Sequence, residues 1–188
     1  VQVYPGNTGI TVPAIPAGVR VVLDDLGRQR VFTAGGEVTA QSLNARDFPS
    51  VQAAVDALSS TYGGEVLLPP GQLDATTTPA FTGVTLTSSK CLRGAAGGGS
   101  ILKQSNANAN AITINGAYCG VYDLQIIGAN AAGSGHGIQV AAGSTFWNQY
   151  INIERVIITQ TPQWGLDIAP ISGGFGAAGI RATAVVID

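Results

Sequence analysis

Few side chains of this chain could carry out acid–base chemistry. Its 188 residues include 11 acidic residues and one histidine, His136. Glycoside hydrolysis requires two carboxyl groups, about 5–5.5 Å apart for retention or about 6.5–9.5 Å apart for inversion. Asp123, Glu154 and Asp167 are the acids to test for such a pair, and Arg155 could act as a base in β-elimination from a uronate. Whether any of these groups meet depends on the elements that hold them.

Short segments with alternating apolar and polar residues recur about every 30 residues in the second half of the chain. One series comprises residues 111–114, 137–140 and 165–168, and a second comprises residues 121–126, 153–158 and 182–187. Going backward, Leu92 extends the second series by one period and aligns with Leu124. Alternation of this kind is typical of strands with one buried face.

Gly- and Asn-rich turns separate these segments, at residues 94–99, 106–110, 128–135 and 173–179. Strands and turns that repeat with this period, without helices between them, predict an all-β fold. In this β-solenoid each coil stacks on the last through parallel pairing. Ile112, Ile138 and Leu166 are expected to stack inside it. The aligned repeats favour this architecture over a β-sandwich, the main alternative.

On a parallel solenoid, outward residues one period apart lie about 4.8 Å apart, so catalytic acids would be stacked in adjacent coils. The alignment places Asp167 beside Gln139 and Thr113, Asp123 beside Arg155, and Glu154 beside Tyr122. No column stacks two acids. Asp123 and Arg155 are most simply a solvated cross-strand ion pair, worth about 0.2–1 kcal/mol. An Arg155 base for β-elimination would need further acids, often with calcium, and the sequence does not supply them.

His136 lies in a Gly-rich turn, without an aligned acid or nucleophile, and is expected to be a surface residue. The sequence therefore predicts no catalytic constellation in this segment, and no metal or cofactor site. Four aromatic residues, however, fall in or beside turns: Phe146, Trp147, Tyr150 and Trp164. They could form a glycan-binding patch, or they could pack between coils or between chains. Both interpretations stay open.

The composition excludes several classes of protein. Only 11% of the residues are charged, 26 are Gly, and the net charge is −2, which argues against nucleic-acid binding and polybasic membrane attachment. No apolar run approaches the roughly 20 residues of a membrane span, so no membrane insertion is expected. Cys91 and Cys119 are expected to be unpaired thiols whose redox state stays open, because two cysteines do not make a disulfide framework.

The first part of the chain differs from the repeats. One helical face is shared by Phe48, Val51, Val55 and Leu58. Asp47 and Pro49 are start signals for this helix, and Gly63–Gly64 is its expected end. The helix is expected to cap the first coil. Residues 1–44 form a small β-rich leader with a hairpin from strands 19–23 and 29–32. Residues 45–188 then form the cap and the first coils.

Residues 46–188 resemble a known superfamily. The resemblance rests on FPSVQAAVDA at 48–57, GGEVLLPPG at 63–71, GVTL at 83–86, LRGA at 92–95 and SIL at 100–102. This order is similar to the opening of the right-handed parallel β-helix in the pectate-lyase-like superfamily, which includes pectate lyases, polygalacturonases and the tailspikes and tail fibres of bacteriophages. Many phage members carry GDGxxDD before the helix, where this chain has only NARD at 44–47.

A short leader without a secretion signal looks most like the N-terminal part of a phage tailspike or tail fibre. That resemblance implies attachment of residues 1–44 to a phage tail or baseplate protein, a homotrimer, and location in the virion tail. It also implies that the whole product recognises and depolymerises bacterial surface polysaccharide, as a hydrolase or lyase, with catalytic residues in coils beyond Asp188. The alternatives are a secreted polysaccharide lyase or glycoside hydrolase acting as a monomer, and a non-catalytic structural virion protein.

Overall fold

A computed structural model describes residues 20–23, 29–33, 36–37, 41–60, 63–141, 150–168 and 179–188. The chain divides into two compact units, Val1–Ala40 and Gln41–Asp188, each considered by itself. In the first unit, β1 (Arg20–Leu23), β2 (Gln29–Thr33) and β3 (Gly36–Glu37) form an antiparallel sheet, which confirms the expected hairpin. The unit ends slightly before the expected boundary at residue 44, because the next strand pairs with the solenoid.

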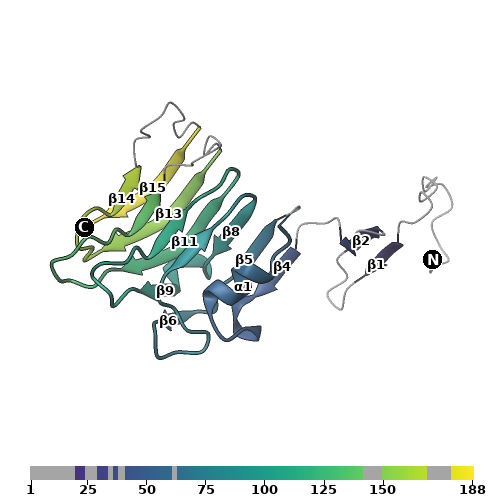
Figure 1. Ribbon diagram of the computed structural model, residues 1–188, viewed down its shortest axis with the longest axis horizontal. Helices are drawn as coiled ribbons and strands as arrows, with labels where there is room; N and C mark the ends of the chain where they lie inside the picture. Colours follow the sequence, from purple (N-terminus) through teal and green to yellow (C-terminus); the bar gives the residue numbers. More distant parts are fainter. Residues whose placement is uncertain are drawn as a thin grey trace. The chain divides into compact units, whose positions relative to one another are not determined.

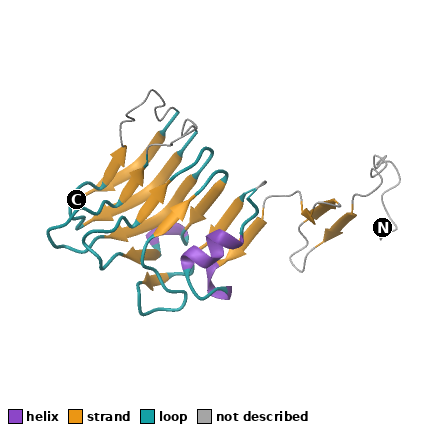
Figure 2. Cartoon of the chain, viewed as in Figure 1, coloured by secondary structure: helices purple, strands orange, loops and turns teal. Residues whose placement is uncertain are grey.

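The described residues between 41 and 188 form a parallel β-solenoid, as the repeats predicted (Figures 1 and 2). A short sheet stacks β7 (Val84–Leu86), β10 (Ile112–Ile114), β12 (Ile138–Val140) and β14 (Leu166–Ile168). A second sheet stacks β4 (Gln41–Asn44), β5 (Gly64–Leu67), β8 (Lys90–Arg93) and the first halves of β11 (Gly120–Ile127), β13 (Asn152–Thr159) and β15 (Arg181–Ile187). The second halves of these long strands continue a third sheet with β6 (Gly71–Leu73) and β9 (Ser100–Lys103).

Each long strand bends where it passes from the second sheet to the third. The bend falls at Asp123, Arg155 and Ala184, whose φ values are 59°, 54° and 52°. A left-handed residue in a strand turns the backbone sharply. One strand can therefore serve two faces of the solenoid, and its first half pairs with β8 while its second half pairs with β9.

The predicted alignment of Leu92 with Leu124 is wrong. Leu92 pairs with Val121, whereas Leu124 pairs with Ser100. Between β8 and β9 the chain makes a Gly-rich excursion that contains the short 3₁₀ helix Ala96–Gly98. Two separate strands thus do in this coil what a single bent strand does in later coils. The spacing found between later coils therefore does not hold before this insertion, and an alignment based on it fails.

The helix α1 (Val51–Ala57) covers the first coil, as expected of a cap. Ser50 is its N-cap and accepts a hydrogen bond from the Ala53 amide at 3.1 Å. Val51 and Val55 are fully buried. The Gln52 side chain also satisfies the open edge of the short sheet: its Oε1 accepts from the Thr85 amide at 2.7 Å. Such pairing protects an edge strand from unwanted association.

The expected end of this helix at Gly63–Gly64 is wrong, because α1 ends at Ala57. The next residue, Leu58, has extended dihedral angles (φ −66°, ψ 143°), and its side chain is buried in the core. The extended conformation of Leu58 lets its side chain enter the core, and the helix therefore ends before the glycines.

Aliphatic columns fill the interior of the solenoid. Ile112 and Ile138 stack in register and are fully buried, and Leu166 continues their column as a partly buried residue. The other two sheets contribute similar columns: Val66, Leu92, Val121 and Ile153, and then Leu102, Ile126 and Ile158. The sequence predicted the first column correctly because inward residues recur at a fixed place in each coil.

Candidate functional site

Five charged side chains alternate in sign across β5, β8, β11 and β13, and we call them the charged column: Glu65, Arg93, Asp123, Arg155 and Glu154. Arg93 Nε donates to Glu65 at 2.7 Å, and Arg93 Nη1 donates to Asp123 at 2.9 Å. Arg155 Nη2 donates to Asp123 at 3.0 Å, and Arg155 also pairs with Glu154. The predicted ion pair of Asp123 and Arg155 is therefore confirmed.

Sequence reasoning missed Glu65 and Arg93 as members of this column. A signal was present, because Arg93 lies 28 residues after Glu65 and 30 before Asp123, close to the coil period. The aromatic ring of Tyr122 adds a cation–π contact, with the Arg93 guanidinium 4.5 Å from its centroid. Among the described strand pairs no acid lies opposite another acid, as the alignment predicted.

The electrostatics of the charged column suit a brace between coils better than a catalyst. Hydrogen bonds from Arg155 hold the pKa of Asp123 below its ordinary value, so this carboxyl is a poor proton donor. The same contact raises the pKa of Arg155, which keeps the guanidinium charged and unsuited to act as a base. The side chain of Asp123 is 13% exposed and that of Arg155 is 49% exposed, so the carboxylate, but not its partner, is less solvated than expected.

We predict that Asp123→Ala lowers the stability of the solenoid by about 1 kcal/mol, or its Tm by about 2–4 °C, because Arg93 and Arg155 would lose the carboxylate that lies between them. Glu65→Gln, at the end of the column, is the matched control and should cost less. Thermal unfolding followed by circular dichroism measures both. Because the pKa of Asp123 is lowered on folding, its contribution is present above pH 4 and is lost as the pH falls through the lowered pKa, so the difference between the two proteins should shrink as the pH falls below 4. Equal stability at pH 7 would contradict the brace.

A second set of polar side chains lies on the outer face of the short sheet, and we call it the polar ladder: Asn110, Thr113, His136, Gln139 and Asp167. Thr113, Gln139 and Asp167 are in register on β10, β12 and β14, as predicted. Gln139 Nε2 donates to Asp167 Oδ2 at 3.0 Å. Asn110 Nδ2 donates to Gln139 at 2.8 Å and to Thr113 at 3.2 Å.

The prediction that His136 is a surface residue without an aligned acid is wrong. Its side chain is only 10% exposed, and its Nε2 lies 3.7 Å from Asp167 Oδ2. Asp167 is aligned with Gln139 and not with His136, so a comparison within columns could not find the pair. The imidazole reaches diagonally to the next coil. Its Nδ1 is buried without a hydrogen-bond partner, which gives a substrate no access to that nitrogen.

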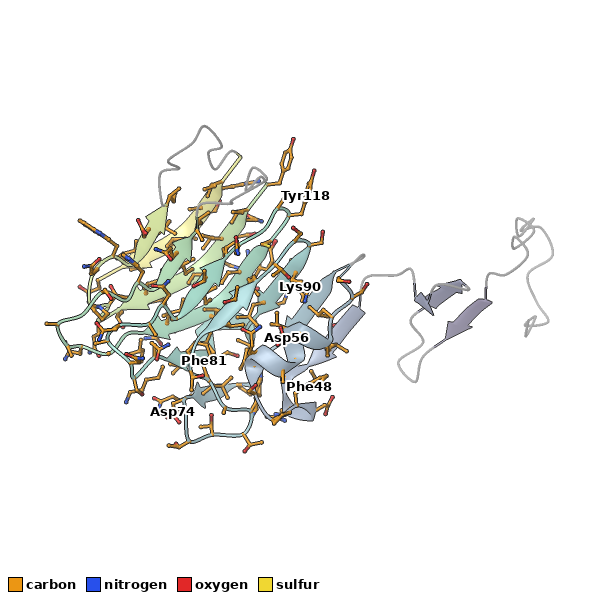
Figure 3. The ribbon with its side chains drawn as sticks, in the orientation of Figure 1. Phe48, Asp56, Asp74, Phe81, Lys90 and Tyr118 are labelled. Atoms are coloured by element: carbon orange, nitrogen blue, oxygen red, sulfur yellow. The ribbon has the colours of Figure 1, made fainter. Side chains whose placement is uncertain are left out.

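The exposed aromatic residues within the described ranges lie at two corners of the solenoid. Tyr150 is 60% exposed and stacks on Tyr118, with ring centroids 5.1 Å apart and an interplanar angle of 13°. Tyr118, which sequence reasoning missed, lies one period before Tyr150, and its ring points away from the sheets (Figure 3). Trp164 is 64% exposed in the turn before β14. Phe146 and Trp147 lie outside the described residues.

Neither cysteine is poised to react. Both thiols are unpaired, as expected. Burial raises the pKa of Cys119 to about 11, and its Sγ donates to the Thr87 carbonyl at 3.0 Å. Burial also raises the pKa of Cys91. Within the described ranges, no group of three or more His, Cys, Asp or Glu could hold a metal ion, and no helix could span a membrane.

The fold and these side chains define a parallel β-solenoid with a capped first coil, polar contacts between coils and exposed aromatic corners. No protein-family model, curated protein or solved structure matches this chain.

Proposed function

We propose that this chain is the N-terminal part of a bacteriophage tailspike or tail-fibre protein. Residues 1–44 would attach it to a phage tail or baseplate protein, and the solenoid would serve as scaffold. The whole product would bind bacterial surface polysaccharide and depolymerise it by hydrolysis or elimination. The observation that carries this proposal is the capped parallel β-solenoid that begins directly after a separate β-rich leader. This architecture is compatible with the resemblance in residues 46–188.

The chemistry of the described residues supports a scaffold role for this segment. Asp123 is held ionised between two guanidinium groups, and Asp167 accepts a hydrogen bond from Gln139 and lies beside His136. Neither carboxyl is opposite a second acid in the strand pairs that the structure describes. The proposal therefore assigns the depolymerase residues to parts of the product outside the described ranges.

A stripe on the outer face of the third sheet, apolar except at Gln125, supports side-by-side association of chains. Ile101, Gln125, Ile157 and Val186 are in register on β9, β11, β13 and β15. Ile157 is 39% exposed and Val186 is 56% exposed. Aligned β-branched side chains on an outer face lose contact with water when a second copy covers them. The proposal therefore includes a homotrimer that uses this stripe.

Ile157→Lys tests the association. We expect the unaltered chain to be trimeric and the variant to shift toward monomer, because the ammonium would be placed in an apolar interface. Size-exclusion chromatography with light scattering gives the mass directly. Thr85→Lys, on an exposed position of the short sheet, is the matched control and should stay trimeric. An unaltered chain that is monomeric would contradict the homotrimer.

The function itself is tested with the full-length product. Incubation with the capsule or lipopolysaccharide of the host bacterium should shorten the glycan chains. Deletion of residues 1–40, which leaves β4 in the solenoid, should abolish incorporation into virions without abolishing that cleavage. Binding without cleavage of the host glycan would contradict the depolymerase and favour the non-catalytic virion protein. Cleavage by a monomer that never enters virions would favour the secreted enzyme.

A further inference from the structure

A column of left-handed residues marks one corner of the solenoid, just before the strands of the second sheet. Ser89, Tyr118, Tyr150 and Gly179 each stand two residues before strand residues that are in register, so they occupy the same position in four successive coils. Their φ values are 63°, 59°, 57° and 67°. The side chains at this corner can therefore be compared from one coil to the next.

The two tyrosine rings of this column stack along the direction in which the coils stack. Their centroids are 5.1 Å apart and their planes differ by 13°, and strands of neighbouring coils lie at a similar distance of about 4.8 Å. Tyr150 therefore covers one face of the Tyr118 ring, and the opposite face is turned toward the preceding coil. There the column has Ser89, whose side chain is too short to cover a phenol ring. Tyr118 is 58% exposed, and its ring points away from the sheets (Figure 3).

The surroundings of this open ring face are small and uncharged. They are the turns at residues 87–89 and 115–118, and the structure describes both turns in full. Thr87 and Ser88 are exposed, so hydroxyl groups lie on the turn that precedes the ring in the column. Lys90 follows this turn, but its side chain is buried and donates to the Val55 carbonyl, so it offers no cation to a ligand at the corner.

The tyrosines occupy a backbone conformation that favours other residues. The left-handed region is unfavourable for residues with a Cβ atom, and glycine is the residue that adopts it most readily. Tyr118 and Tyr150 accept this cost at rings that stay 58% and 60% exposed, so burial in the solenoid does not offset much of it. Residues held in unfavourable backbone conformations are enriched at binding sites. The exposed stack therefore indicates a role in binding.

We propose that the open face of Tyr118, together with the turn at residues 87–89, is a subsite for a neutral sugar. A pyranose has an apolar face of C–H groups, which packs on the phenol ring, and hydroxyl groups around its edge, which exchange hydrogen bonds with the hydroxyls of the turn. Tyr150 is a positioning residue that holds the Tyr118 ring from its other face. The inference rests on the proposed recognition of polysaccharide, and it places one sugar contact within the scaffold segment.

The first test is a titration of the full chain, followed by NMR, with two neutral probes, cellohexaose and maltohexaose, and with oligogalacturonate. At least one neutral probe should shift the ring signals of Tyr118 until they saturate, and oligogalacturonate should bind no more tightly, because no cation faces the ring. Tyr118→Ala should weaken the bound probe at least about tenfold. Tyr118→Phe, which keeps the ring, is the matched control and should stay within about threefold of the unaltered chain.

A second pair of variants tests the face of the ring that binds. Ser89→Tyr places a third ring in the column, in the same backbone conformation as the other two tyrosines, and should weaken the probe at least about tenfold although Tyr118 is intact. Ser89→Gly suits the left-handed conformation and leaves the ring face open, so binding should stay within about threefold. Circular dichroism would verify that each variant is folded.

Four results would overturn the subsite: no response of the Tyr118 ring to either neutral probe, tighter binding of oligogalacturonate, binding that survives Tyr118→Ala or Ser89→Tyr, or a lower mass of Tyr118→Ala in light scattering. The last result would mean that a second copy of the chain covers the ring. The proposed function still stands if the full-length product binds host polysaccharide. If that product binds no bacterial polysaccharide while the chain binds a neutral probe through Tyr118, the proposed function fails and the subsite remains.

Discussion

Gly116→Ala is expected to lower the free energy of unfolding by at least about 3 kcal/mol, or the Tm by roughly 6–12 °C. Gly116 is buried in the turn after β10, against the equivalent turn of the preceding coil. A Cβ atom at this position would lie 2.2 Å from the Ser88 amide nitrogen and 2.7 Å from the Thr87 carbonyl carbon. Both are backbone atoms, so no side-chain rotation can relieve the overlap. The two coils must separate locally, and their shared hydrogen bonds weaken.

Gly99→Ala is the matched control for this prediction. The nearest atom to a Cβ there would be the Ala95 Cβ, at 3.4 Å, with two carbonyl oxygens at 3.6 and 3.8 Å in ordinary contact, and Gly99 has an ordinary right-handed conformation (φ −65°). We expect a change within about 0.5 kcal/mol. Urea unfolding monitored by circular dichroism gives both values. Similar midpoints for the two variants would show that the coils are not stacked as closely as the structure has them.

Lys90→Ala is expected to cost about 2–4 kcal/mol, because it removes a long buried side chain from the first coil. Lys90 is only 6% exposed and lies among the strands (Figure 3). Its Nζ donates to the carbonyl of Val55, at the C-terminal end of α1, at 2.8 Å. A cation at a helix C-terminus is favourable. Cys119 and Ile151 occupy the equivalent inward positions in the next two coils. Of these three coils, only the one next to α1 has a lysine at this position, where its ammonium contacts the helix.

Lys90→Met separates packing from charge in the same site. The Val55 carbonyl also accepts from the Leu58 amide at 3.2 Å, so it keeps a partner when the ammonium is removed. Methionine fills a similar volume, and the variant should be within about 1 kcal/mol of the unaltered chain. A loss from Lys90→Met as large as that from Lys90→Ala would contradict this, and would mean that the ammonium itself holds α1 on the solenoid.

The features that repeat once per coil could be predicted from the sequence. The contacts of residues that depart from the repeat could not. Inward aliphatic residues recur once per coil, so the registers of Ile112, Ile138 and Leu166 and of Asp123 and Arg155 were predicted correctly. The alignment of Leu92 failed because the 94–99 excursion interrupts the repeat. The prediction for His136 failed because its imidazole reaches across two columns to Asp167.

By itself, the sequence determined the class of fold, the stacking of the coils, the presence of a cap and the absence of stacked acids among the aligned columns. It could do so because a solenoid converts separation along the chain into a fixed position in space. Tertiary structure alone decided the contacts of the long side chains. The side chains of Arg93, Lys90 and His136 extend several ångströms from the backbone, in directions that the repeat does not specify. Their partners therefore depend on which groups the neighbouring coils place within reach. Although few residues of the chain are charged, the structure contains two ordered polar networks, the charged column and the polar ladder. Side chains that extend diagonally between coils hold each of them together.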